Sequence, residues 1–279
     1  MNQGIPTLYK FSKNVGDIMK FARHFFIYIF ILNCAACVTL NETGQSVFML
    51  TSEEQEKELG EKGYQEVLSK EKISKDQKTI AILERVGHRI AKVAGKPDYQ
   101  WEFTLIESDQ LNAWCMPGGK VAVYTGILPY MQTEAGMAVV LGHEVAHATL
   151  RHSGQRISRE MGIGTALQIF SGGSSGDQNA LLGLLGAGAR FGTMPFDRKH
   201  ETQADLIGLK YMAKAGYDPK ESVAFWQRFG KATQGSAPPE FLSTHPGAST
   251  RIKDLQQNMS QALSLYNQAS AQYGTGTSL

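Results

Sequence analysis

Apolar and polar positions repeat with the period of a helix over most of the chain. One predicted helix carries apolar or small residues at steps of three and four on a single face: Ile80, Leu83, Gly87, Ile90 and Ala94. Ser52 precedes two glutamates and is a typical helix cap. The predicted helices span 53–69, 76–94, 134–152, 198–215, 219–231 and 249–272.

A shorter stretch has the period of a strand. Trp101, Phe103 and Leu105 alternate with polar residues. Two more strands are expected at 112–116 and 120–124, joined by a Pro-Gly-Gly turn. Three strands make only a small sheet, so the pattern predicts an α+β, predominantly helical domain.

The first 36 residues have the layout of a signal peptide. Lys20 and Arg23 precede an apolar block at 25–32, which is too short to be read as a transmembrane helix. The 18 residues before Met19 make the basic region too long, so we expect translation to start at Met19. The remaining boundaries are an extended arm at 37–52, the main folded domain at 53–272 and a disordered tail at 273–279.

Cys37 is the expected lipidation site. Two alanines directly before it resemble the bacterial lipobox, and a lipid anchor would hold the protein at a membrane surface. Cys34 fits less well, because it follows Asn33. The match at Cys37 departs from the usual lipobox in one position, because Cys34 stands three residues before it where leucine is usual. An ordinary cleaved signal and an uncleaved anchor are the alternatives. Cys115, the remaining thiol, is expected in a buried strand.

Charge and cysteine content exclude several classes of protein. The full chain has 28 basic and 26 acidic residues, but residues 37–279 have 24 and 25. The slight basicity therefore belongs to the export signal, and we expect no nucleic-acid partner. Three cysteines exclude a disulfide framework. The chain also lacks the long apolar stretches of a protein with several membrane spans.

His143, Glu144 and His147 form an HExxH pattern within the predicted helix at 134–152. Residues four apart share a helix face, so both imidazoles can reach one metal ion with the glutamate beside them. This is the arrangement of zinc metallopeptidases. Small apolar residues on the other faces predict a buried helix, where such a polar patch is costly unless metal and solvent satisfy it.

The third ligand of a catalytic zinc must come from elsewhere in the chain. The metzincin extension fails, because Ser153 stands where its third histidine would lie. On the helix at 198–215, Glu201 can ligate zinc while Asp205 accepts the ring N–H of a ligating histidine. A helix salt bridge is the alternative for Asp205, and His200 is a competing ligand.

These motifs resemble the gluzincin zinc metallopeptidases that include the CAAX prenyl protease and HtpX, and within them a bacterial periplasmic lipoprotein branch of the BepA and LoiP type. The resemblance implies a zincin-like fold and one zinc ion per chain, held by His143, His147 and Glu201, with Glu144 as general base. The matching stretches lie at 43–45, 52–55, 112–114, 117–119, 125–128, 143–156, 201–205, 215–219, 244–246 and 251–252.

Two further residues are candidates for the second donor to the oxyanion of the reaction. These are His245 and Arg251. If the loop at 234–246 closes over the site, His245 could instead take the fourth zinc position and keep the enzyme latent. A loop histidine without a role is the third interpretation.

Substrate is expected to bind as an added strand along Asn112, Ala113, Trp114 and Cys115. Backbone pairing of this kind selects weakly for sequence, which suits a protease that clears misfolded or unassembled exported proteins. The Gly/Ala/Leu tract at 162–192 is interpreted as a flap over the cleft, with a membrane-dipping hairpin as the alternative.

The leading prediction is therefore a zinc endopeptidase of cell-envelope quality control. Its expected location is the periplasm of a Gram-negative bacterium, with a lipid anchor in the outer membrane, or else a soluble or N-terminally anchored periplasmic form. An outer-membrane assembly factor or chaperone that uses the same cleft with low turnover is the alternative function. A CAAX-type intramembrane protease is disfavoured, because multiple spans are lacking. The oligomeric state is not predicted.

Overall fold

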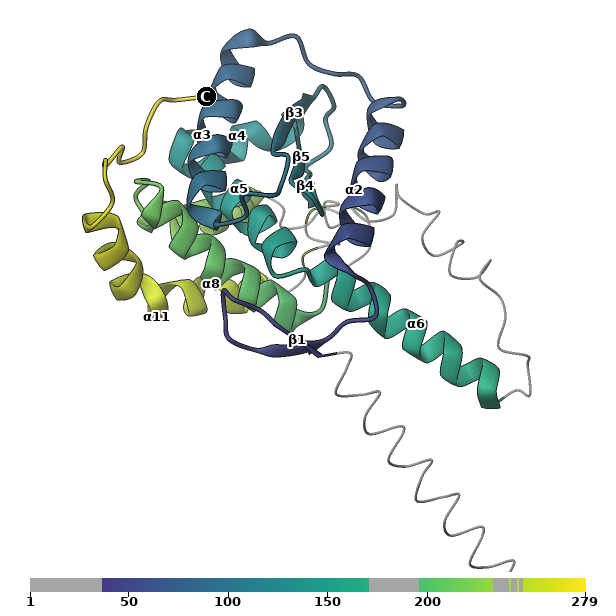
Figure 1. Cartoon of the computed structure of the whole chain (residues 1–279). Coiled ribbons are helices and arrows are strands. Elements are labelled where there is room, and N and C mark those ends of the chain that lie inside the picture. Colours follow the sequence, from purple (N-terminus) through teal and green to yellow (C-terminus); the bar gives the residue numbers. More distant parts are fainter. Residues whose placement is uncertain (1–36, 171–195, 233–240, 242–244, 246–247) are drawn as a thin grey trace, which may run out of the picture. The chain divides into compact units, whose positions relative to one another are not determined.

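The computed structural model describes residues 37–170, 196–232, 241, 245 and 248–279 (Figure 1). The predicted signal peptide, the start at Met19 and most of the tract at 162–192 and the loop at 234–246 lie outside these residues. The chain divides into two units, residues 1–50 and 51–279. Among the described residues, no helix has both the length and the apolarity that crossing a membrane requires.

The described part of the first unit is a small hairpin. Strands β1 (Cys37–Thr39) and β2 (Ser46–Phe48) pair antiparallel, with Cys37 opposite Phe48. Gly44 closes the turn by donating its N–H to the carbonyl of Leu40. Its φ of 66° lies in the left-handed region that favours glycine. The stretch expected as an extended arm therefore folds back on itself.

The second unit begins with two capped helices. Helix α2 (Glu53–Leu68) starts with a capping box between Ser52 and Gln55. Helix α3 (Gln77–Ala94) starts at Asp76, whose side chain accepts from the N–H groups of Lys78 and Thr79. Both helices begin and end within two residues of the predicted positions.

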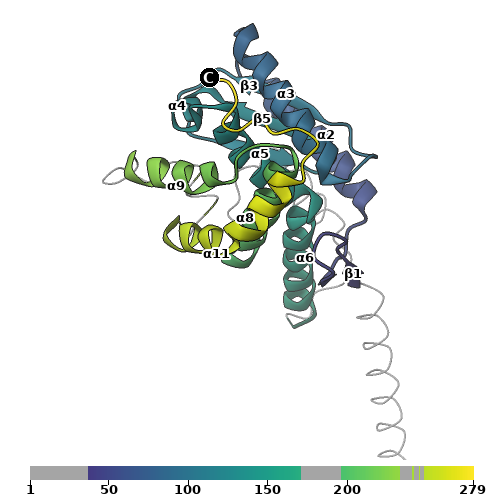
Figure 2. The ribbon, with the colours of Figure 1, turned by 90° about the vertical axis from the view of Figure 1, so that its left-hand side faces the viewer.

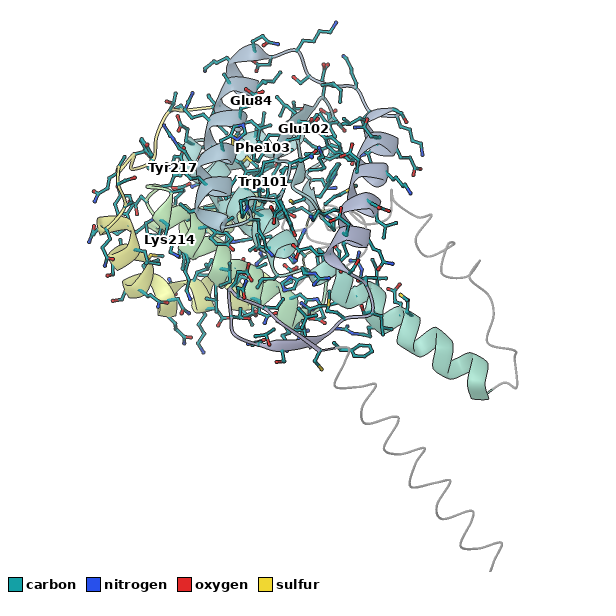
Figure 3. All side chains as sticks on the ribbon, viewed as in Figure 1. Glu84, Trp101, Glu102, Phe103, Lys214 and Tyr217 are labelled. Atoms are coloured by element: carbon teal, nitrogen blue, oxygen red, sulfur yellow. The ribbon has the colours of Figure 1, made fainter. Side chains whose placement is uncertain are left out.

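The sheet consists of β3 (Glu102–Ile106), β4 (Ala113–Met116) and β5 (Lys120–Tyr124). Its order is β3-β5-β4, with β3 parallel and β4 antiparallel to the buried central strand β5. In Figure 1 the strands lie between α3 and α2, against which β3 and β4 pack. Trp101 and Phe103 stack with their ring planes within 6° (Figure 3). A Cβ atom at Gly87 of α3 would lie 2.4 Å from the Phe103 ring, which is why the helix has glycine there.

Helix α5 (Glu134–Thr149) is the buried axis of the second unit, because all of its 16 residues are buried. It follows a 3₁₀ turn η1 (Thr125–Ile127) and the short helix α4 (Leu128–Met131), which the sequence pattern did not predict. Helix α8 (Arg198–Lys214) packs along α5 (Figures 1 and 2). A Cβ atom at Gly208 would lie 2.8 Å from the carbonyl carbon of Gly142, so the two backbones meet through glycine.

The prediction of one helix over 134–152 is wrong. Helix α5 ends at Thr149 and α6 (His152–Phe170) begins three residues later. Arg151 between them has a φ of 54°, which is unfavourable for a residue with a side chain. Its buried guanidinium donates to both carboxylate oxygens of Glu56, at 2.7 and 2.9 Å, and to the carbonyl of Thr51. These bonds offset the strained backbone.

Helices α9 (Lys220–Ala232) and α11 (Ala248–Asn267) complete the helical layer against α8 and α5. The last helix was predicted to reach residue 272 and ends five residues earlier.

The prediction of a disordered tail at 273–279 is also wrong. The N–H of Tyr273 donates to the carbonyl of Gly216 at 2.7 Å, and the carbonyl of Thr277 accepts from the N–H of Glu134 at 2.9 Å. The N–H of Leu279 donates to the carbonyl of Gln132. The first N–H groups of a helix have no acceptor within the helix. Residues 273–279, here called the C-terminal strap, supply carbonyl acceptors to the first N–H groups of α5.

Candidate active site

Three helices of the second unit bring the candidate chemistry together. Helix α5 carries His143, Glu144 and His147, α8 carries Glu201 and Asp205, and α11 carries Arg251. His245 precedes α11 and joins the group from outside these helices. Each of these seven residues is at most 5 % exposed. The close packing of α5 on α8 through glycine is what brings the two sets of side chains into contact.

The donor atoms of His143, His147, Glu201 and His245 all lie within 4.8 Å of one another. The Nε2 atoms of His143 and His147 are 3.0 Å apart, and Glu201 Oε1 is 3.3 Å from His147 Nε2. The Nδ1 atom of His245 lies 3.1 Å from His143 Nε2 and 3.0 Å from Glu201 Oε1. Ligands on a tetrahedral zinc ion with bonds of about 2.0–2.1 Å are roughly 3.3 Å apart. The spacing of these four donors therefore fits one zinc ion.

The protonation states of His143, His147 and Glu201 also suit a metal. Burial lowers the pKa of His143 to about 4 and that of His147 well below its usual range, so both imidazoles are neutral. Burial acts to raise the pKa of Glu201, but His245 and His147 outweigh it and hold that pKa well below its usual range. Neutral imidazoles and an ionised carboxylate are the forms that bind metal.

Glu144 lies beside the donor group without belonging to it. Burial raises its pKa to about 7, an effect that the charge of His245 opposes. Its Oε1 is 3.4 Å from His245 Nε2 but has no hydrogen bond among the described residues. Buried polar atoms are nearly always satisfied, so this oxygen indicates a partner that the described residues do not supply.

Asp205 and Arg251 lie around His143. Asp205 Oδ1 is 3.0 Å from His143 Nδ1, the contact that the role expected of Asp205 requires. The Nε and Nη2 atoms of Arg251 donate to the two oxygens of Asp205, at 2.7 and 2.6 Å. Its Nη1 lies 3.0 Å from Glu201 Oε2, and its guanidinium stacks on Trp226 at 3.7 Å. Two donors of Arg251 therefore bind Asp205, whereas its Nη1 has no hydrogen bond among the described residues, so the oxyanion role expected of Arg251 stays a prediction.

A comparison with known protein families decides the identity of this arrangement. The model for peptidase family M48 matches residues 77–259, which contain the whole donor group. The chain belongs to peptidase family M48.

Curated relatives of this M48 chain come from distant organisms. The mitochondrial metalloendopeptidase OMA1 of Schizosaccharomyces pombe is 36% identical over 213 residues, which cover 74% of this chain and 62% of that protein. The OMA1 of Bos taurus is 31% identical, covering 80% and 46%. The beta-barrel assembly-enhancing protease of Escherichia coli is 27% identical, covering 84% and 50%. The chain thus spans less than two thirds of the length of each of these relatives.

The M48 site is bordered by β4, an edge strand of the sheet. The carbonyls of Asn112 and Met116 accept bonds from Tyr124 and Gly119, on the side of β5. Strand alternation directs the backbone of Ala113 and Cys115 to the other side, and the N–H of Cys115 donates to the carboxylate of Glu144. The side chain of Trp114 does not line this edge. It packs in the core, where its ring meets the ring of Tyr64 edge-on with centroids 6.0 Å apart.

Two more histidines of the M48 chain border the site, and only one of them contacts a donor. His152 Nδ1 lies 2.9 Å from His147 Nδ1, a contact that the sequence analysis missed although a histidine five residues after HExxH was visible. His200, the expected competitor to Glu201, lies outside the donor group. Its Nε2 is 3.3 Å from Gln155 Oε1.

Proposed function

We propose that this M48 chain is a zinc-dependent endopeptidase. The observation that carries the proposal is the buried donor group of His143, His147 and Glu201 with the unsatisfied carboxylate of Glu144 beside it. A bound zinc ion would supply Lewis-acid polarisation of water and of the peptide carbonyl. His143, His147 and Glu201 would hold it, and Asp205 would orient His143.

Glu144 is the proposed general base. Its carboxylate receives one backbone N–H from Cys115, and its other oxygen is left without a hydrogen bond. That oxygen can take a proton from the attacking water and return it to the leaving amine. The same bond fixes Glu144 next to the edge of β4, where an extended substrate would add as a strand through Ala113 and Cys115.

His245 is proposed to keep the enzyme latent in the conformation of this structure. Its Nδ1 occupies the fourth donor position, within 3.1 Å of both His143 Nε2 and Glu201 Oε1. Withdrawal of this side chain would open that position to water and substrate. His245→Ala should therefore raise basal cleavage of an unfolded substrate, and a fall in cleavage would assign it to oxyanion stabilisation instead. Arg251 is proposed as a positioning residue, because its Nε and Nη2 donate to the two oxygens of Asp205, and its charge lies 3.0 Å from Glu201 Oε2.

The proposed substrates are misfolded or unassembled exported proteins of the cell envelope. The E. coli relative is named for enhancing β-barrel assembly, whereas the OMA1 relatives are named as mitochondrial. These names support an endopeptidase more strongly than any one location. We further propose anchoring through a lipid on Cys37, which is exposed. Cys37→Ser should move the protein from the membrane fraction to the soluble fraction, and unchanged membrane association would refute the anchor.

Cleavage of unfolded casein tests the proposed activity. The purified protein should cleave it, a chelator should stop the reaction, and added zinc should restore it. Glu144→Gln should retain zinc and lose about 10²- to 10⁴-fold in rate, the usual contribution of a general base. Cleavage that persists in the chelator or in Glu144→Gln would contradict the proposal.

A further inference from the structure

His152 is a buried histidine that the proposed function does not use. It is the first residue of α6 and is 0% exposed. Its Nδ1 lies 2.9 Å from the Nδ1 of His147, and its Nε2 lies 3.2 Å from Oε1 of Gln203 on α8. The ring of His200 stacks on it, with centroids 4.2 Å apart and planes within 21°. Sealed from solvent, each ring nitrogen of His152 has its partner inside the protein.

The break between α5 and α6 creates this contact. In a continuous helix, residues five apart point about 140° away from each other, so residue 152 would face away from His147. The left-handed turn at Arg151 redirects the chain and returns His152 to the donor group. The ion pair of Arg151 with Glu56 holds that turn.

The chemistry of the partners sets the direction of the hydrogen bonds. The amide oxygen of Gln203 can only accept, so His152 Nε2 donates to it. A neutral His152 then has its lone pair on Nδ1 and accepts the N–H of His147 Nδ1. His147 is left with its lone pair on Nε2, the atom that faces His143 and Glu201.

We propose that His152, backed by Gln203, is a positioning residue that holds His147 in the one tautomer able to bind zinc. His152 serves His147 as Asp205 serves His143. The inference rests on the proposed function, because it concerns a ligand of the proposed zinc site.

Four variants separate this role from simple packing. His152→Leu fills the space and removes the acceptor. His152→Asn places an amide oxygen where Nδ1 lies, whereas the longer His152→Gln reaches toward Gln203 instead. His200→Leu is the matched control, because it removes the stacked ring and leaves both hydrogen bonds of His152 in place.

The readout is the dissociation constant for zinc, measured by competition with a chromophoric chelator, together with the absorption spectrum of the Co²⁺-loaded protein. Loss of such a partner typically costs about 10- to 100-fold in metal affinity. We expect that loss in His152→Leu and His152→Gln, with an altered cobalt spectrum. His152→Asn and His200→Leu should stay close to the wild type.

Wild-type affinity in His152→Leu would overturn the inference, as would an equal loss in His152→Asn or in His200→Leu. If His152→Leu does not fold, the contrast between the Asn and Gln variants decides, and equal affinities would refute the role. A wild-type protein that binds no zinc would instead refute the proposed function, so the two failures are distinguishable.

Discussion

Helix α5 carries a buried glutamate in each half, and the two differ in how fully their carboxylate oxygens are hydrogen-bonded. At the N-terminal end, Glu134 accepts from Arg85 at 2.7 Å, from the Tyr217 hydroxyl at 2.9 Å, and from Arg89 and the Thr277 N–H. Ten residues later, Glu144 is just as buried, yet its Oε1 has no hydrogen bond among the described residues. A satisfied buried carboxylate stabilises the fold, whereas an unsatisfied one marks a place where chemistry is done.

Exchanging each carboxylate for its amide should separate stability from activity. Glu134→Gln should lower the free energy of unfolding by about 2 kcal/mol, less than the roughly 3–5 kcal/mol of a fully buried pair because Arg85 and Arg89 keep some exposure. Glu144→Gln should leave the stability of the metal-free protein equal or higher, because it replaces a buried, unsatisfied carboxylate by a neutral amide. Urea denaturation measures both, and equal destabilisation by the two variants would abolish the distinction.

Acid should weaken the Glu134 network in a defined range. Burial acts to raise the pKa of Glu134, but Arg85 and Tyr217 outweigh it and hold that pKa below its ordinary value of 4.5. A carboxyl with a lowered pKa contributes its full stability above its unfolded-state pKa and loses it as the pH falls through the folded one. The stability difference between wild type and Glu134→Gln should therefore be constant above pH 4.5 and shrink below it. A constant difference down to pH 2 would contradict this.

The C-terminal strap gives the smallest expected effect. Gly276 has a φ of 68°, and a Cβ atom there would lie 2.6 Å from Glu134 Cβ, whereas Gly274 has a φ of 61° and open space around it. Both alanine variants should cost about 1 kcal/mol from the backbone alone. Gly276→Ala should raise the cost further by displacing Glu134. Thermal unfolding of both variants checks this, and equal melting temperatures would show that the strap does not constrain Glu134.

The sequence was most informative where local spacing determines geometry. HExxH on a helix places two imidazoles on one face, because residues four apart lie on the same side of a helix. Glu201 and Asp205 are also four residues apart and therefore share one face of their own helix. Caps at Ser52 and Asp76 predicted two helix starts because their bonds are local. All these contacts span a few residues of chain.

Long-range contacts explain what sequence reasoning missed. The helix break at Arg151 depends on Glu56, almost a hundred residues away, and without that break His152 would not meet His147. The polar, glycine-rich composition of residues 273–279 predicts a disordered tail, but the N–H groups of Glu134 and Ala135 of α5 need the carbonyl acceptors that this strap offers. No local pattern contains such information.

Zinc content is the most direct test of the central claim, that the unsatisfied end of α5 holds a metal. Mass spectrometry with a plasma source should find one zinc per chain in the wild type, in Glu134→Gln and in Glu144→Gln, and far less in a folded Glu201→Ala variant. A folded wild-type protein that retains no zinc after purification in zinc-containing buffer would contradict the account.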